Sequence, residues 1–180
     1  MLKLKIGLVF FLLFVVLSLI LSYAGRMTGT VVDAESGKPI EGAIVLVEWT
    51  MKKGIGLTHT TSYSAKEKVT DRDGRFSVNA VLNPFVNAPD VTIYKKGYVA
   101  WNSRWIFPDR RNRTDFIWGD NIFKLEHFKE GYSYDEHTDF IRLSINSSMN
   151  LESKKLIYDA FRWEDQLAFE ERQRLGTIIK

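Results

Sequence analysis

Alternating apolar and polar positions run from about residue 26 to residue 96, recur over residues 121–126, and predict a β-rich region. The clearest segments are rich in β-branched and aromatic residues, as strands usually are. Four segments carry this pattern and are expected to be strands: residues 27–32, 43–49, 91–94 and 121–126. Short strands separated by turn signals at this spacing predict a β-sandwich.

Two further strands are expected on either side of an acidic turn. Residues 67–70 and 75–78 flank the sequence Asp-Arg-Asp-Gly at 71–74, and Asp-Gly supplies the positive φ that tight turns need. The pattern therefore predicts a hairpin across this turn. Residues 52–64 contain two glycines and many hydroxyl side chains, and they are expected to form a long loop or an irregular hairpin.

The hydrophobic period changes after Asn150. Apolar residues then recur at helical spacing, with charged residues between them: Leu156, Ile157, Ala160, Trp163 and Leu167. Asn150 is a suitable N-cap and Gly176 a suitable stop, so we expect an amphipathic helix of about 25 residues. Residues 129–180 are thus predicted to be a solvated linker followed by this helix, which docks on the sandwich or on a partner. The expected fold class is mainly β, a sandwich followed by a long C-terminal amphipathic helix.

Residues 1–24 have the composition of a secretory signal peptide. A basic start precedes an almost unbroken apolar run that ends at Leu21, and Ser22 and Ala24 then supply a small-x-small exit. The run is short for a membrane-spanning helix but long for a signal core, so residues 6–22 can alternatively remain as a membrane anchor. We expect this segment to contact the membrane and the chain to be exported, either to the periplasm or out of the cell.

The net charge and the absence of cysteine exclude several classes of protein. The formal charge is +3, and removal of residues 1–24 takes away two lysines and lowers it to +1. Such a nearly neutral domain has no general electrostatic attraction for nucleic acid. Without cysteine the chain can form neither disulfides nor thiolate metal sites.

Three motifs occur in a fixed order. They are Gly29-x-Val31-x-Asp33-x-x-Ser36-Gly37-x-Pro39-Ile40-x-Gly42-Ala43-x-Val45, then Thr70-Asp71-x-Asp73-Gly74-x-Phe76, then Lys96-Gly97-Tyr98. Together they resemble the carboxypeptidase regulatory-like domain, a transthyretin-like (prealbumin-like) β-sandwich of Ig-like, Greek-key topology. The resemblance covers residues 26–126 and implies that residues 25–128 form one such domain.

The first motif shapes the backbone and carries no chemistry of its own. Asp33 can accept N–H bonds across its own turn, Gly37 relieves a position with positive φ, and Pro39 starts the next segment with φ already fixed. The stretch therefore identifies a fold and leaves the ligand open.

One combination of residues suggests zinc chemistry. Residues 127–130 read His-Phe-Lys-Glu, and His137 follows ten residues after His127. His127, Glu130 and His137 could form a three-ligand zinc site with an open position. The metallocarboxypeptidases, whose H-x-x-E pair this resembles, need a far larger catalytic fold, so we expect no metal or other cofactor. The turn at 71–74 starts like a calcium loop, but Leu82 stands where the bidentate Glu is needed.

The segment 101–118 has the composition of a binding surface. Exposed tryptophan and arginine are typical of binding hot spots, and aromatic faces stack on sugar rings. The candidate binding residues are Trp101, Arg104, Trp105 and Trp118. Alternatively, these tryptophans pack over an open face of the sandwich and the arginines are solvated around them.

These observations favour an exported, non-catalytic binding or interaction module of the cell envelope, whose partner is an envelope protein or a glycan. The second hypothesis is a carbohydrate-binding protein that uses segment 101–118, and the third is a zinc hydrolase. Burial of Trp101 and Trp105 would exclude the sugar platform. Separation of the two histidines from each other and from Glu130 would exclude the zinc site.

Overall fold

The computed structural model describes residues 11–15, 25–54, 59–116, 122–145 and 151–178. Of the predicted signal peptide or anchor at residues 1–24, the structure describes residues 11–15, which form a short helical segment; the other residues lie outside the described ranges. Within the described ranges, none of the helices combines the length and the apolar composition needed to cross a membrane.

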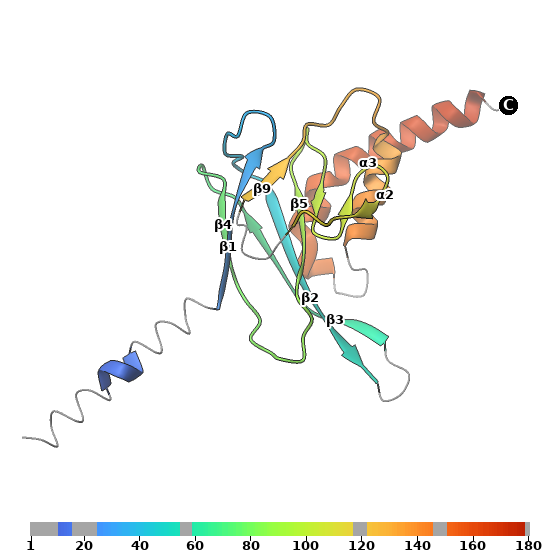
Figure 1. The fold of residues 1–180 in the computed structure, drawn as a ribbon. Coiled ribbons are helices and arrows are strands. Elements are labelled where there is room, and N and C mark those ends of the chain that lie inside the picture. Colours follow the sequence, from blue (N-terminus) through green and yellow to red (C-terminus); the bar gives the residue numbers. More distant parts are fainter. Residues whose placement is uncertain (1–10, 16–24, 55–58, 117–121, 146–150, 179–180) are drawn as a thin grey trace, which may run out of the picture.

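Two sheets form a β-sandwich (Figure 1). In the first sheet, β1 (Arg26–Asp33) lies between an antiparallel β4 (Arg75–Asn79) and a parallel β9 (Ile122–Leu125). The second sheet has the order β3 (His59–Val69), β2 (Ile44–Lys53), β5 (Asp90–Tyr94) and β6 (Trp101–Asn102), all antiparallel. A small ribbon of β7 (Trp105–Ile106) and β8 (Arg111–Asn112) follows β6. The predicted mainly β class is confirmed. The strands predicted at 27–32, 43–49, 91–94 and 121–126 correspond to β1, β2, β5 and, over the described residues 122–125, β9.

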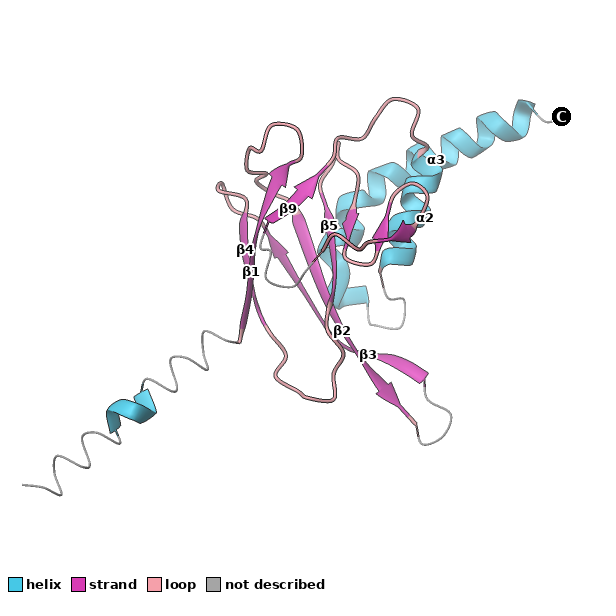
Figure 2. Cartoon of the chain, viewed as in Figure 1, coloured by secondary structure: helices cyan, strands magenta, loops and turns pink. Residues whose placement is uncertain are grey.

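Helices add a third layer on the outer face of the second sheet (Figure 2). They are α2 (Tyr134–Ser144), the 3₁₀ turn η1 (Leu151–Lys154) and α3 (Lys155–Ile178). The α3 helix continues beyond the sheet, so that its C-terminal end projects from the body of the molecule (Figure 1). The second sheet is therefore covered on both faces.

Burial on both faces explains the composition of β2. Val45, Val47 and Trp49 point into the core between the two sheets, where they pack with Val31 and Phe123. The alternate residues of β2 face the helices instead, and Leu46 is wholly buried there. A strand that is covered on both sides needs apolar residues at nearly every position, as residues 43–49 have.

The turn at 71–74 forms as predicted, but the hairpin around it is wrong. The Asp71 carboxylate accepts N–H bonds from Asp73 (3.0 Å) and Arg75 (2.8 Å), and Gly74 has a φ of +70°. The flanking strands belong to different sheets, because β3 pairs with β2 whereas β4 pairs with β1. The turn is thus a corner at which the chain passes between the two layers. Residues 52–64 lie mostly in the long β2–β3 hairpin, with residues 55–58 outside the described residues.

The predicted linker is wrong over residues 134–144, which form α2. Ser133 caps this helix, since its hydroxyl accepts the N–H of Glu136 (3.2 Å). Ser-x-x-Glu is a capping-box sequence, so this signal was available in the chain. The helix has only short apolar stretches, yet Phe140 and Ile141 are buried against the sheet and α3.

The C-terminal helix is confirmed, with differences at both ends and in its buried face. It has 24 residues and follows η1, Asn150 lies outside the described residues, and Gly176 lies within the helix instead of ending it. Its buried positions are Ile157, Phe161, Glu164 and Ala168, whereas Leu156 is exposed. The buried face is thus displaced from the predicted apolar stripe and includes a glutamate, which is hydrogen-bonded to Tyr94 and His137.

Candidate functional site: a polar pocket beside Trp105

A pocket of about 400 Å³ opens where the second sheet meets the end of α2. We name it the Trp105 pocket. Its lining residues come from β2, from β5 to β7, and from the last turn of α2: Glu48, Asp90, Asn102, Arg104, Trp105, Arg142, Leu143, Ser144 and Ile145. Volumes of this size are at the lower end of those that hold small ligands.

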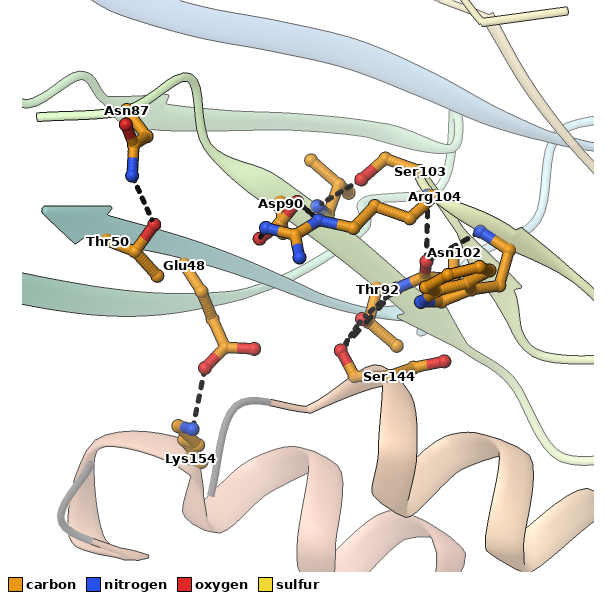
Figure 3. Close-up of polar contacts among 12 residues, drawn as sticks. Glu48, Thr50, Asn87, Asp90, Thr92, Asn102, Ser103, Arg104, Ser144 and Lys154 are labelled. Carbon is orange, nitrogen blue, oxygen red and sulfur yellow. Dashed lines mark hydrogen bonds and ion pairs between the residues drawn. The ribbon is translucent and has the colours of Figure 1, made fainter. Parts of the chain in front are cut away.

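The strand side of the pocket is organised by Asn102. Its side-chain oxygen accepts the backbone N–H groups of Arg104 (2.8 Å) and Trp105 (3.0 Å), which fixes the chain between β6 and β7. Its amide nitrogen donates to the hydroxyl of Thr92 (3.0 Å). Arg104 is thereby placed beside Asp90, to which its guanidinium donates two hydrogen bonds (Figure 3).

The helix side of the pocket ends at Ser144. Its carbonyl oxygen accepts hydrogen bonds from the Thr92 hydroxyl (3.3 Å) and the Asn102 amide (3.5 Å), so the last turn of α2 is bonded to β5 and β6 (Figure 3). Its hydroxyl has no hydrogen-bond partner among the described residues, although Ser144 is only 8% exposed. A buried hydroxyl without a partner is uncommon in proteins. Ser144 lines the pocket, so its unsatisfied hydroxyl lies at the edge of the cavity.

Glu48, one of the lining residues, belongs to a buried ion pair. Glu48 on β2 and Lys154 at the end of η1 are 2.6 Å apart, and their side chains are 3% and 1% exposed (Figure 3). Lys154 thus fixes the start of α3 to the middle of the second sheet. Two N–H groups at the first turn of α3, those of Leu156 and Ile157, donate to the carboxylate of Glu67 on β3 and anchor the same helix end.

All four charged residues that line the pocket are paired. Besides Glu48 with Lys154 and Asp90 with Arg104, Arg142 donates to Asp165 of α3 (2.6 Å). Burial raises the pKa of Asp90 above its ordinary value, and the hydrogen bond and charge of Arg104 oppose that rise. The lining therefore combines two acids and two bases, and its formal charge is zero.

The structure describes three of the four predicted binding residues and separates Trp101 from the other two. Arg104 and Trp105 lie together in the Trp105 pocket, and Trp105 is 37% exposed. Trp101 is 7% exposed and belongs to the sandwich core, where it makes edge contacts with Phe116 and Phe123. A platform that includes Trp101 is therefore wrong. Trp118 lies outside the described residues.

A second, larger hollow is lined partly by residues of the segment 99–116. It measures about 610 Å³ and runs between β9 and residues 99–116. Arg113 lies over the Trp101 ring, 4.6 Å from its centroid, and donates to the carbonyl of Asn102 (2.7 Å). Burial lowers the pKa of Arg113, and the Asp115 carboxylate opposes this shift. The arginine thus covers the aromatic face that a ligand would need.

The alternative zinc site does not form, because His127 and His137 belong to separate clusters. His127 stacks on Tyr98 and lies 2.7 Å from the carboxylate of Asp33. Asp33 also accepts bonds from the backbone and hydroxyl of Ser36, which with other hydrogen bonds lower its pKa to about 2. This cluster fixes the first turn of the sandwich to the segment after β9. Within the described part of the chain, no group of three or more His, Cys, Asp or Glu could hold a metal ion.

His137 is used to dock the helices. Its Nε2 accepts the backbone N–H of Ala100 (2.9 Å), so the proton of the neutral ring lies on Nδ1, 2.6 Å from Glu164 Oε2. The other oxygen of Glu164 accepts the hydroxyl of Tyr94 (2.7 Å), which in turn accepts the indole N–H of Trp163 (2.7 Å). Burial and the neighbouring Glu164 raise the pKa of Tyr94, so the phenol remains a donor. This buried chain of hydrogen bonds joins α2, α3 and β5.

Asp90, Asn102 and Ser144 of the Trp105 pocket were not predicted from the sequence. They are far apart along the chain, and none belongs to a recognisable motif. Only the pairing of β5 with β6 and the docking of α2 bring them together.

Comparisons with known proteins give a limited result. No family model and no curated protein matches the sequence. Among solved structures, the chain is similar to a streptococcal ancillary pilin at 17% identity and a TM-score of 0.33. The match covers 59% of this chain and 30% of the pilin chain.

Proposed function

We propose that this protein is an exported, non-catalytic interaction module of the cell envelope that binds its partner at the Trp105 pocket. The domain at residues 25–128 is proposed to be of the carboxypeptidase regulatory-like type, on the three motifs that resemble that family. The observation that carries the proposal is the pocket itself, which combines a half-exposed tryptophan, an unpartnered hydroxyl and a set of paired charges.

The state of the polar groups supports binding in preference to catalysis. General acid–base chemistry needs a group that is free to exchange a proton with the substrate. Each of the four charged residues of the pocket already has a partner. His137 is fully buried with both ring nitrogens engaged, and His127 is held by Asp33 and Tyr98.

The arrangement of the helices supports a single preformed binding surface. The second hydrophobic cluster, the His137 chain of hydrogen bonds and the buried Lys154–Glu48 pair all join the helices to the second sheet. The strand and helix walls of the pocket are therefore held together before a ligand arrives, which lowers the ordering cost of binding.

Export is tested by fusing residues 1–24 to a reporter enzyme that is active only outside the cytoplasm. We expect activity, because a basic start and a long apolar run direct export, and loss of activity when Leu13→Arg places a charge in that run. Equal activity of both fusions would contradict the proposal.

Binding at the pocket is tested by cosedimentation of the full chain with purified cell-envelope fragments. We expect Trp105→Ala to reduce the bound fraction, whereas Phe85→Ala leaves it unchanged. Phe85 is a suitable control because it is 78% exposed and does not line the pocket. Equal binding by both variants would show that the Trp105 pocket is not the interaction site.

A further inference from the structure

We infer that the Trp105 pocket binds a neutral pyranose residue of a glycan. This inference rests on the proposed function, since it names the ligand class of the same site. It combines three properties of the pocket: apolar surface from Trp105 and Leu143, hydrogen-bonding groups from Asp90, Arg104 and Ser144, and a lining of zero formal charge.

The apolar surface matches one face of a sugar ring. A pyranose presents C–H groups on its faces, and these stack on an aromatic ring. Trp105 lines the pocket and is 37% exposed, so part of its indole is open to solvent. Leu143 of α2 lines the same pocket and is 64% exposed, which extends the apolar surface from the strand side to the helix side.

The polar groups match the hydroxyls on the edge of the ring. The Arg104–Asp90 pair places donors and acceptors side by side, and Arg104 keeps guanidinium N–H groups beyond the two that bind Asp90. Each hydroxyl of a vicinal pair can both donate and accept a hydrogen bond. The unpartnered Ser144 hydroxyl can also donate or accept, and a ligand hydroxyl would satisfy it.

The paired charges favour a neutral ligand over an anion. An anion at Arg104 or Arg142 would have to compete with Asp90 or Asp165, which already neutralise these guanidinium groups. A neutral sugar can instead share the exposed N–H groups without breaking either pair. The volume of about 400 Å³ also suits a ligand of one or two rings.

The test is isothermal titration calorimetry on the full chain, kept in a detergent without sugar groups. The probes are neutral tetrasaccharides of β-linked N-acetylglucosamine, β-linked glucose and α-linked glucose, with tetragalacturonate as the anionic counterpart. We expect at least one neutral tetrasaccharide to bind and tetragalacturonate not to bind. Trp105→Ala should weaken that binding at least about tenfold, because the stacking surface is lost.

Matched variants separate the parts of the site. Trp105→Phe keeps an aromatic face and should lose less affinity than Trp105→Ala. Ser144→Ala removes one hydroxyl and should weaken binding about two- to tenfold, as loss of one hydrogen bond does. Phe85→Ala should bind as the parent chain does. Circular dichroism of each variant verifies that the fold is retained.

Each outcome decides between the proposals. The ligand class is wrong if none of the neutral probes binds, if tetragalacturonate binds more tightly, or if Trp105→Ala binds as the parent does. The proposed function survives those results if envelope fragments still bind in a manner that depends on Trp105. It fails separately when cosedimentation is insensitive to Trp105→Ala.

Discussion

Replacing Lys154 with methionine removes one partner of the buried ion pair that fixes η1 to β2. The Lys154 and Glu48 side chains are 1% and 3% exposed and lie 2.6 Å apart, so water cannot take the place of the lost ammonium. Removal of one partner from such a pair typically costs about 3–5 kcal/mol, because the remaining charge stays buried. The same loss would lower the melting temperature by roughly 6–20 °C in a chain of this size.

The neighbouring residue provides the control. Lys155 pairs with Asp159 on the surface of α3, where the lysine side chain is 73% exposed. Exposed pairs of this kind contribute about 0.3–0.5 kcal/mol, so Lys155→Met should be nearly neutral. Substitution of both Glu48 and Lys154 by methionine should recover most of the stability lost by Lys154→Met, because no unpaired charge remains.

The free energy of unfolding is obtained from urea titrations followed by circular dichroism. The reasoning about burial would be refuted if Lys154→Met and Lys155→Met cost the same. It would also be refuted if the double variant were less stable than Lys154→Met alone, since the buried charge would then not be the source of the loss.

Three further predictions concern turns and the helix interface. Gly74→Ala should destabilise the fold by more than about 2 kcal/mol, since its Cβ would lie 2.4 Å from a backbone oxygen at a φ of +70°. Gly37→Ala meets no atom within 4 Å and should cost only the roughly 1–2 kcal/mol of a left-handed backbone; urea unfolding measures both variants. The pKa of Asp33 is lowered from 3.8 to about 2, so the stability that it contributes is complete above pH 3.8 and is lost as the pH falls towards 2. Asp33→Asn should therefore flatten this part of the profile of melting temperature against pH, and an unchanged profile would contradict the assignment. Tyr94→Phe should lower the free energy of unfolding by about 2–3 kcal/mol, because its hydrogen bond to buried Glu164 is lost. The same substitution should cost clearly less in a Glu164→Gln background, and equal costs in this double-mutant cycle would show that the two side chains do not couple.

The strands and turns of the sandwich were predictable because their signals are local. Alternation and β-branched residues mark β1, β2, β5 and β9, and Asp71 with Gly74 marks the corner between sheets. The sequence also indicates Arg104 and Trp105 as binding residues, and both line one pocket. The carboxypeptidase regulatory-like assignment stays a prediction from motif resemblance.

The pairing of strands and the burial of individual side chains were not predictable, because both depend on which distant segments of the chain meet. The turn at 71–74 looks like a hairpin, yet β3 and β4 pair in different sheets. Trp101 and Trp105 lie in the same tryptophan- and arginine-rich segment. Trp101 lies on β6 and is buried in the core, whereas Trp105 lies after the turn held by Asn102 and lines the pocket. Local sequence does not show which of the two tryptophans is buried and which is exposed.

The sequence by itself determined the β-rich class, the position of most strands and the C-terminal helix, because periodicity and turn chemistry act over a few residues. It also singled out the segment that contains Arg104 and Trp105. The tertiary structure alone decided the covering of the second sheet by α2 and α3, the pairing of His137 with Glu164 and the convergence of Asp90, Asn102 and Ser144. These features depend on burial, and burial makes polar groups at distant positions satisfy one another once water is excluded.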